Sequence, residues 1–134
     1  MKTIYLCGPI ADRTDAQCKV WRDGVTAAWP GKTLDPLRRD YRGRELEDPA
    51  QLVAHDLDDI DNSDGLLVWF DAPSVGTSME VFYAKSEGKP IVVVDARADR
   101  SCPLSPWLVH HVDRIVQDVG VALLILAELC VKTR

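Results

Sequence analysis

The segment DGLLVWFDAPSVGTSMEVFYA, residues 64–84, changes within a few residues from a continuous apolar run to apolar residues at helical spacing. This change limits how the chain can fold more than any other feature of the sequence. Leu66–Phe70 is a continuous apolar run between turn-type residues, which predicts a strand buried on both faces. After a short loop, Thr77 offers an N-cap hydroxyl three residues before Glu80, and apolar residues then recur at helical spacing. The sequence therefore predicts a helix that begins at about Thr77, directly after a buried strand.

Glu80 lies in the first turn of this expected helix, beside the carboxyl end of the preceding strand. In open α/β sheets that edge is where ligands bind, so Glu80 is a candidate functional carboxylate. The structural alternative is a capping box, in which the Glu80 side chain only returns a hydrogen bond to the backbone of Thr77. The local pattern favours neither interpretation over the other.

Predicted strands and helices alternate along the chain, and their order predicts the fold class. Strands are expected at 2–7, 32–35, 66–70, 91–94 and 114–116, and helices within 16–28, 49–62, 77–87 and 119–131. This order is typical of an α/β fold, here a doubly wound, flavodoxin- or Rossmann-like parallel sheet of five strands with helices on both faces. With 134 residues, the chain fits a single domain spanning residues 1–134.

Composition and charge argue against several kinds of partner. The chain has 21 acidic and 16 basic residues and a net charge of −5, so it lacks the cationic excess that binds a nucleic acid polymer. The N-terminus does not have the pattern of a signal peptide, and no apolar span reaches the roughly 18 residues of a membrane helix. We therefore expect a cytoplasmic protein that does not bind membranes.

The cysteine and histidine patterns do not suggest a metal site. The four cysteines are scattered without a CxxC pair, and in the absence of a secretory signal we expect free thiols. His110 and His111 are adjacent, so they cannot form the i, i+4 pair of a helical metal site. The glycine-rich motifs of dinucleotide- and ATP-binding folds and the GxSxG motif of serine hydrolases are also missing. We therefore expect neither a metal nor an organic cofactor.

Acid chemistry remains, with Glu80 and Asp56 as the candidate pair. Asp56 lies in the acid-rich second half of the helix expected at 49–62, where carboxylates meet the unfavourable end of the helix dipole. Two carboxylates facing one pocket, one ionised as nucleophile and one protonated as acid, can cleave a glycosidic bond with retention. That mechanism places the two carboxyl groups roughly 5 to 5.5 Å apart.

Five motifs in order, YLCGPI, PLRRDYRG, HDLDDIDNSDGLLVWF, SVGTSMEVFYA and GKPIVVV, resemble those of the nucleoside 2-deoxyribosyltransferase family and its nucleotide N-hydrolase relatives. The resemblance runs from about Lys2 to Val116. It implies a five-stranded flavodoxin-like sheet, a small-molecule nucleoside or nucleotide substrate from nucleotide salvage, and no cofactor. It also implies a homodimer or higher homo-oligomer whose active sites borrow residues from a neighbour, with Pro106–Asp113 extending toward that neighbour. Packing of this segment under the last helix of its own chain is the alternative.

The resemblance also implies roles for individual residues. Glu80 matches the family's nucleophile, which attacks the anomeric carbon and forms a glycosyl-enzyme ester. Asp56 matches the acid that faces the leaving base, and Tyr5 matches a first-strand tyrosine whose hydroxyl orients the nucleophile. Gly8 and Gly76 fall among the substrate-binding positions. From the residues alone, a tyrosine at the end of a first strand, such as Tyr5, is more often part of the core.

Ser74 departs from the pattern of the transferases that act on free nucleosides. By the family resemblance, those transferases have an aspartate six residues before the nucleophile, and it binds the 5′-hydroxyl of the sugar. The nucleotide-hydrolysing relatives have a serine at that position, and it contacts a 5′-phosphate. A hydroxyl beside the amides of a helix N-terminus suits a phosphate, which a carboxylate repels. Pro9 replaces a second phosphate-binding serine, and nearby arginines are candidates to compensate: Arg13, Arg38 and Arg39.

Asp40, within LRRDYRG, matches the position at which the family reads the base. A carboxylate accepts hydrogen bonds and cannot donate them, so it favours the exocyclic amino group of cytosine or adenine. The sequence leaves base transfer and hydrolysis open as outcomes. A noncatalytic nucleotide-sensing module on the same fold is the alternative from another class, because fold does not fix function.

Overall fold

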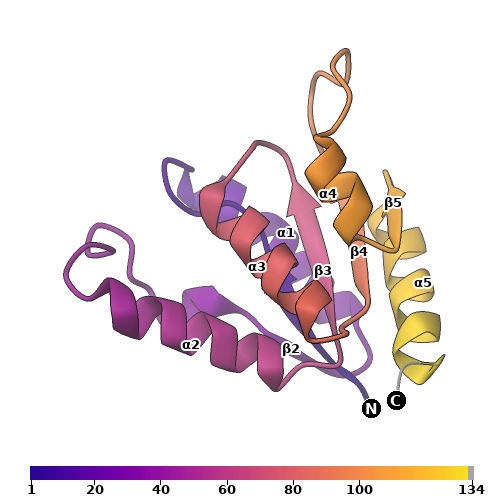
Figure 1. Cartoon of the computed structure of the whole chain (residues 1–134), viewed down its shortest axis with the longest axis horizontal. Coiled ribbons are helices and arrows are strands. Elements are labelled where there is room, and N and C mark those ends of the chain that lie inside the picture. Colours follow the sequence, from indigo (N-terminus) through magenta and orange to yellow (C-terminus); the bar gives the residue numbers. More distant parts are fainter. Residues whose placement is uncertain (133–134) are drawn as a thin grey trace.

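The computed structural model describes residues 1–132 and has an α/β fold built on one parallel sheet (Figure 1). The strands are β1 (Thr3–Cys7), β2 (Lys32–Leu34), β3 (Gly65–Phe70), β4 (Ile91–Asp95) and β5 (Arg114–Val116). The helices are α1 (Asp15–Ala28), the 3-10 turn η1 (Pro36–Arg38), α2 (Pro49–Asp61), α3 (Val75–Ser86), α4 (Pro106–His111) and α5 (Val119–Lys132). The predicted fold class is confirmed.

The five strands are all parallel and lie in the order β2-β1-β3-β4-β5. From β1 the chain passes to β2 on one side, whereas β3 lies on the other side. The connections that leave the carboxyl ends of β1 and β3 therefore run in opposite directions. In open α/β sheets the crevice at such a switch point is where ligands bind.

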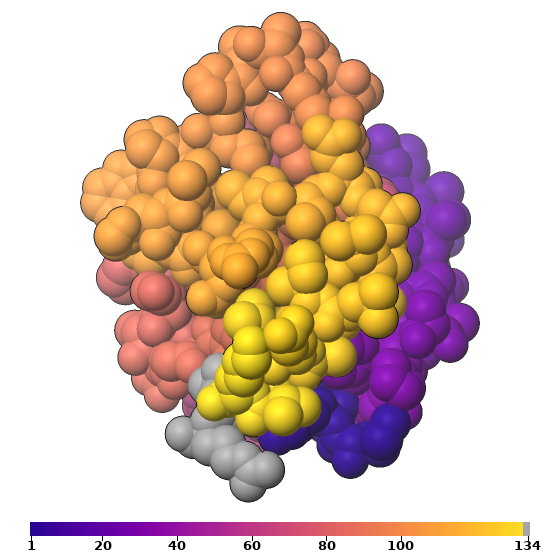
Figure 2. Space-filling model, turned by 90° about the vertical axis from the view of Figure 1, so that its right-hand side faces the viewer, coloured from indigo at the N-terminus to yellow at the C-terminus, as the bar shows by residue number. Residues whose placement is uncertain are grey.

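The sheet separates two cores, because successive side chains of a strand point to opposite faces. On one face, α1 and α5 cover residues such as Ile4, Leu6 and Leu67. On the other face, α2, α3 and α4 cover Tyr5 and Cys7 among others. Figure 1 shows α2, α3 and α4 in front of the sheet, and Figure 2 shows the outer surface of α5 in yellow. Tyr5 and Cys7 therefore face the helices that carry the candidate carboxylates.

Helix α3 begins earlier than the sequence predicted. Its N-cap is Ser74, whose Oγ accepts a hydrogen bond from the backbone N–H of Thr77 at 3.3 Å, and its first helical residue is Val75. The predicted start at Thr77 is wrong because two hydroxyl residues lie close together and the earlier one makes the cap. Glu80 consequently lies in the second turn, so the capping-box interpretation of Glu80 is also wrong.

Helix α4 is a second difference, since the sequence predicted a loop up to Pro106 and only a strand at 114–116. Ser105 caps α4 through its Oγ, which accepts from the backbone N–H of Trp107 at 3.2 Å, and Pro106 occupies the first turn. Within residues 1–132, none of the helices combines the length and apolar character needed to cross a membrane.

Candidate active site

A cavity of about 190 Å³ opens at the switch point between the carboxyl ends of β1 and β3. Three elements supply its polar walls: the loop after β1, the loop after β2 together with α2, and the start of α3. Lining residues include Gly8, Arg39, Tyr41, Arg42, Asp56, Ser74, Gly76, Thr77 and Glu80. The chain thus brings together six of the ten predicted site residues in one cavity lining, and a seventh, Tyr5, contacts Glu80 directly.

Both carboxylate oxygens of Glu80 accept hydrogen bonds from β1. The Tyr5 hydroxyl donates to Oε2, and the Cys7 thiol donates to Oε1 over 3.8 Å. Burial raises the pKa of Glu80 from 4.5 to about 7, the Tyr5 hydrogen bond opposes this shift, and the negative charge of Asp56 adds to it. Burial also raises the pKa of Tyr5 and of Cys7, so both remain protonated donors at neutral pH.

Asp56 reaches the same cavity from α2. Burial raises its pKa from 3.8 to about 6, the Arg39 guanidinium 3.8 Å away opposes the shift, and the negative charge of Asp59 adds to it. Burial raises the pKa of both carboxyls, and the negative charge of Asp56 raises that of Glu80 further, so the proton that the pair keeps near pH 7 lies mainly on Glu80 in the free protein. One ionised and one protonated carboxyl is the state that acid–nucleophile chemistry needs.

Two of the other acids of α2, Asp59 and Asp61, have structural partners. Asp59 is buried and accepts hydrogen bonds from Arg38 at 2.7 and 2.8 Å and from Arg39 at 2.6 Å, which pins the loop after β2 onto α2. Asp61 accepts from the hydroxyl of Tyr83 at 2.7 Å. The acid-rich half of α2 thus divides its carboxylates between holding the loop and facing the cavity.

Ser74 and Gly76, at the start of α3, and Gly8, directly after β1, also line the cavity. The Ser74 oxygen accepts from the backbone of Thr77, which leaves the Ser74 hydroxyl hydrogen available to donate to a ligand. A Cβ on Gly8 would lie 2.7 Å from the Trp21 ring, so no larger residue fits at this end of β1. Thr77 is 2% exposed, and its Oγ1 has no hydrogen-bond partner within residues 1–132.

Asp40 and Arg13 are not brought to the cavity lining. Asp40 is exposed and accepts three side-chain hydrogen bonds from Arg42, at 2.7, 2.9 and 3.1 Å, and Arg42 lines the cavity in its place. Arg13 forms an ion pair with Asp71 at 2.6 Å. Arg39 is therefore the arginine among the compensating candidates that reaches the cavity.

Sequence reasoning missed Cys7 and Tyr41. Cys7 had a signal, since it lies two residues after Tyr5 on the same strand and so on the same face. Tyr41 is held by His55, whose Nδ1 lies 2.9 Å from the Tyr41 hydroxyl, and no local pattern predicts that long-range contact.

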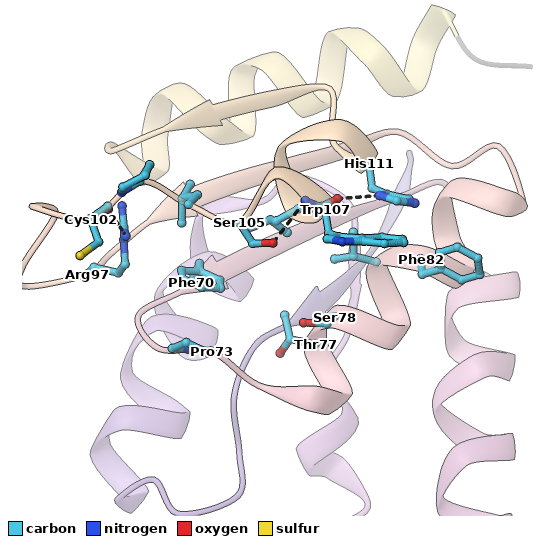
Figure 3. Close-up of a pocket in the computed structure, with 14 residues that line it drawn as sticks. Phe70, Pro73, Thr77, Ser78, Phe82, Arg97, Cys102, Ser105, Trp107 and His111 are labelled. Carbon is cyan, nitrogen blue, oxygen red and sulfur yellow. Dashed lines mark hydrogen bonds between the residues drawn. The ribbon is translucent and has the colours of Figure 1, made fainter.

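A second cavity, of about 520 Å³, lies along α3 and beneath α4 (Figure 3). Its lining is mainly apolar and includes Phe70, Phe82 and Trp107. The Trp107 ring is stacked on His111 with centroids 6.2 Å apart, and Trp107 is 74% exposed. We call this the aromatic cavity.

Within residues 1–132, no cluster of three or more His, Cys, Asp or Glu side chains suits a metal ion.

Comparison with known proteins gives a match over most of the chain. The family model described as nucleoside 2-deoxyribosyltransferase matches residues 4–124. None of the curated proteins compared with the chain matches it.

Solved structures are similar in fold at low sequence identity. A 2-deoxyribosyltransferase from Bacillus psychrosaccharolyticus is 14% identical with a TM-score of 0.73, over 89% of this chain and 88% of that one. A conserved protein from Enterococcus faecalis is 16% identical with a TM-score of 0.76, over 96% and 99%. The CMP N-glycosidase of Clostridium botulinum is 18% identical with a TM-score of 0.58, over 94% and 99%.

Proposed function

Because the chain belongs to the nucleoside 2-deoxyribosyltransferase family, we propose that it cleaves the N-glycosidic bond of a nucleoside or nucleoside 5′-monophosphate. The glycosyl group is held on Glu80 as a covalent ester and is then passed to another base or to water. One observation supports this proposal most directly. Glu80, whose two carboxylate oxygens accept hydrogen bonds from Tyr5 and Cys7, lines the same cavity as Asp56.

In the first step the Glu80 carboxylate attacks the anomeric carbon while the bond from that carbon to the base nitrogen breaks. The bonding electron pair leaves with the base, which takes the proton of Asp56. In the second step the Asp56 carboxylate accepts a proton from the incoming base or water, and the acceptor displaces Glu80 from the anomeric carbon. Two inversions at the same carbon give net retention.

Tyr5 and Cys7 orient the nucleophile in this proposal. Their hydrogen bonds stabilise the ionised form of Glu80 and oppose the effect of burial on its pKa. Arg39 does the same for Asp56 from the other side of the cavity. Because the donors on β1 favour ionised Glu80, the single proton of the pair can move to Asp56 when a substrate fills the cavity, and this move works against the charge of Arg39.

Ser74 favours a nucleoside 5′-monophosphate as the substrate. Its hydroxyl hydrogen is free to donate, and the backbone N–H groups of Val75 and Gly76 lie at the N-terminus of α3 beside it. Arg39 and Arg42 add positive charge to the cavity wall. We propose that Gly76 allows close approach of the sugar, that Gly8 contacts the substrate through its backbone, and that Arg13 contributes only if it releases Asp71.

For base selection we propose that Asp40 accepts from an exocyclic amino group after Arg42 releases it. Arg42 now occupies both oxygens of the Asp40 carboxylate, so a ligand must displace that ion pair. Asp40→Asn should lower the preference for cytosine or adenine over uracil or thymine substrates, as measured by the ratio of their kcat/KM values.

We also propose that the protein is a homodimer or higher homo-oligomer with shared active sites. Large apolar side chains are exposed along one face of α3 and on α4 beside the aromatic cavity, and they are Val75, Met79, Phe82 and Trp107. A patch of this kind is typical of a protein interface. Pro106–Asp113, which includes α4, is the segment that would reach the neighbouring subunit.

Product analysis tests the function. The purified protein is incubated with a panel of nucleosides and 5′-monophosphates, with and without an acceptor base, and released bases and new nucleosides are separated by chromatography. Base release from a monophosphate in water indicates the hydrolase, and a new nucleoside indicates the transferase. Tight binding of a nucleotide without turnover of any substrate would favour the sensing module.

A further inference from the structure

Arg22, on α1, is a fully buried arginine that the proposed reaction does not use. It is 0% exposed, and its guanidinium donates to the carbonyl oxygen of Leu6 at 2.9 Å and of Gly8 at 3.0 Å. Its acidic partner, Asp35, lies 3.4 Å away. Burying a charged group is costly unless it makes specific interactions, and here most of those interactions go to the backbone at the end of β1.

The end of β1 lacks a neighbouring strand on the side of β2. The pairing of β1 with β2 ends at Tyr5 and Leu34, and the chain then turns away at Asp35 into η1. Leu6 and Gly8 lie beyond this last pair. The Arg22 guanidinium supplies donors to their carbonyl groups where β2 no longer can, and Asp35 holds it from the end of β2.

This stretch of backbone carries both donors to the candidate nucleophile. Leu6 and Gly8 flank Cys7, and Tyr5 precedes them, while Tyr5 and Cys7 bond the two oxygens of Glu80. A shift of the strand end would therefore move both donors together. Holding two backbone carbonyls with one planar fork limits that shift more than a single contact does.

Aromatic stacking fixes the guanidinium in turn. The Arg22 Cζ atom lies 4.5 Å from the centroid of the Trp21 ring, and Trp21 is stacked on Trp69 with centroids 5.5 Å apart and planes 5° apart. The same Trp21 ring leaves no space for a Cβ on Gly8. Side chains from α1 and β3 thus enclose the end of β1 on the face opposite Glu80.

We propose that Arg22 is a positioning residue, a buried clamp on Leu6 and Gly8 that holds Tyr5 and Cys7 against Glu80 and places a positive charge behind the cavity. The proposal rests on the proposed function for its effect on turnover. Its effect on the Glu80 carboxyl can be measured without turnover.

The charge of Arg22 acts on the same groups. It lowers the pKa of Glu80, of Asp56 and of Cys7 against the larger, opposite effect of burial. The groups facing the Glu80 carboxyl are the neutral donors Tyr5 and Cys7 on β1 and the acid Asp56 on α2, with Arg39 beside Asp56. Loss of the Arg22 charge should therefore raise the pKa of Glu80.

Two substitutions separate the charge from the clamp. Arg22→Lys keeps the charge but replaces a two-pronged donor with a single ammonium, and Arg22→Gln removes the charge. Trp29→Phe is the matched control, because the Trp29 Nε1 donates from the end of α1 to the Lys2 carbonyl at 2.9 Å, at the other end of β1. It removes a buried contact to the same strand far from Glu80.

The readouts are the melting temperature, kcat, KM, the pH profile, and the titration of the Glu80 carboxyl by carbon NMR, assigned by comparison with Glu80→Gln. Both Arg22 variants should lower kcat about tenfold to a hundredfold with a smaller change in KM, since misplaced catalytic groups have effects of this size. Arg22→Gln should also raise the pKa of the Glu80 carboxyl, measured in this titration, by about half a pH unit or more.

A purely structural role predicts a different result. Suppose that the Arg22 variants melt at a lower temperature, as Trp29→Phe should, but have the same kcat and the same Glu80 pKa as Trp29→Phe. The positioning role is then wrong. If Arg22→Gln does not fold, kcat of Arg22→Lys decides. A wild-type protein that turns over no substrate would contradict the proposed function, and the NMR titration would still decide whether Arg22 acts on Glu80.

Discussion

The two cavities that flank α3 differ in almost every physical respect, although Thr77 lines both. The cavity of the candidate active site, which we call the site cavity, is lined by Glu80 and Asp56. Both carboxyls have raised pKa values, and each has a hydrogen-bonding or ionic partner. The aromatic cavity is larger and mainly apolar, and Trp107 stands exposed at its edge. One helix therefore presents groups suited to chemistry on one side and groups suited to association on the other, and substitutions on the two sides should fail differently.

The largest expected effect is on the chemical side. Glu80→Gln removes the proposed nucleophile and should lower kcat by about a thousandfold or more without loss of the fold, measured by base release and circular dichroism. Glu87→Gln, at the exposed C-cap of the same helix, is the control and should keep wild-type activity. Near-wild-type turnover in Glu80→Gln would remove Glu80 from the mechanism.

Asp56→Asn should have the next largest effect. Loss of the acid should lower kcat by about 100- to 10,000-fold for poor leaving groups and by less for bases that depart without protonation. Asp58→Asn, exposed on the same helix, is the matched control. Equal losses for good and poor leaving groups would contradict an acid role for Asp56.

Trp107→Ala tests the other side of the comparison. An exposed tryptophan at a protein interface commonly contributes about 2 kcal/mol, so the substitution should weaken self-association roughly 30-fold. Sedimentation at several concentrations measures this, and activity should fall as the variant dissociates. A wild-type monomer that is fully active at assay concentration would dispose of the shared-site proposal.

Ser74→Asp sharpens the description of the site cavity. One charge-assisted hydrogen bond contributes about 1.5 to 3 kcal/mol, so the wild type should prefer a monophosphate over its nucleoside by about tenfold or more. Aspartate at position 74 should reverse that ratio of kcat/KM, because it repels the phosphate and accepts from the free 5′-hydroxyl. Ser78→Asp, one turn further along α3 and exposed, controls for added charge. A wild type that favours the nucleoside, with a ratio unchanged in Ser74→Asp, contradicts the phosphate assignment.

The smallest expected effect is on stability. The folded-state pKa of Glu80 is raised from 4.5 to about 7, so the folded protein binds more protons than the unfolded chain between these values and loses stability as pH rises through them. Above about pH 7, the free energy of unfolding of Glu80→Gln should therefore exceed that of the wild type by roughly 1 to 3 kcal/mol. The difference should shrink toward pH 4, as measured by denaturant unfolding at several pH values. A difference that does not depend on pH would contradict the raised pKa.

The sequence predicted the fold well because periodicity and turn residues are local. The strands at 66–70 and 91–94 and the helix at 49–62 agree with β3, β4 and α2 to within a residue or so. The start of α3 was missed because Ser74 and Thr77 both offer a capping hydroxyl. Helix α4 was missed because its six residues are too few to show a period.

The candidate site was predictable only where a motif or a face identified the residue. Glu80 was predicted from its position after the end of a buried strand, and Asp56 from the acid-rich helix that leads into that strand, together with the family motifs. The ion pair that occupies Asp40 and the backbone contacts of Arg22 depend on segments brought together by the whole fold, so no local pattern predicts them. In the sequence, Arg22 reads as an ordinary surface arginine of an amphipathic helix.

The two outermost strands of the sheet, β2 and β5, each span three residues, whereas the strands between them span five or six. A short outer strand offers few unpaired backbone groups to a strand from another molecule, so continuous sheets cannot grow easily from one molecule to the next. Concentrated solutions of this protein should therefore resist β-type aggregation, even though the inner strands are rich in valine, leucine and isoleucine.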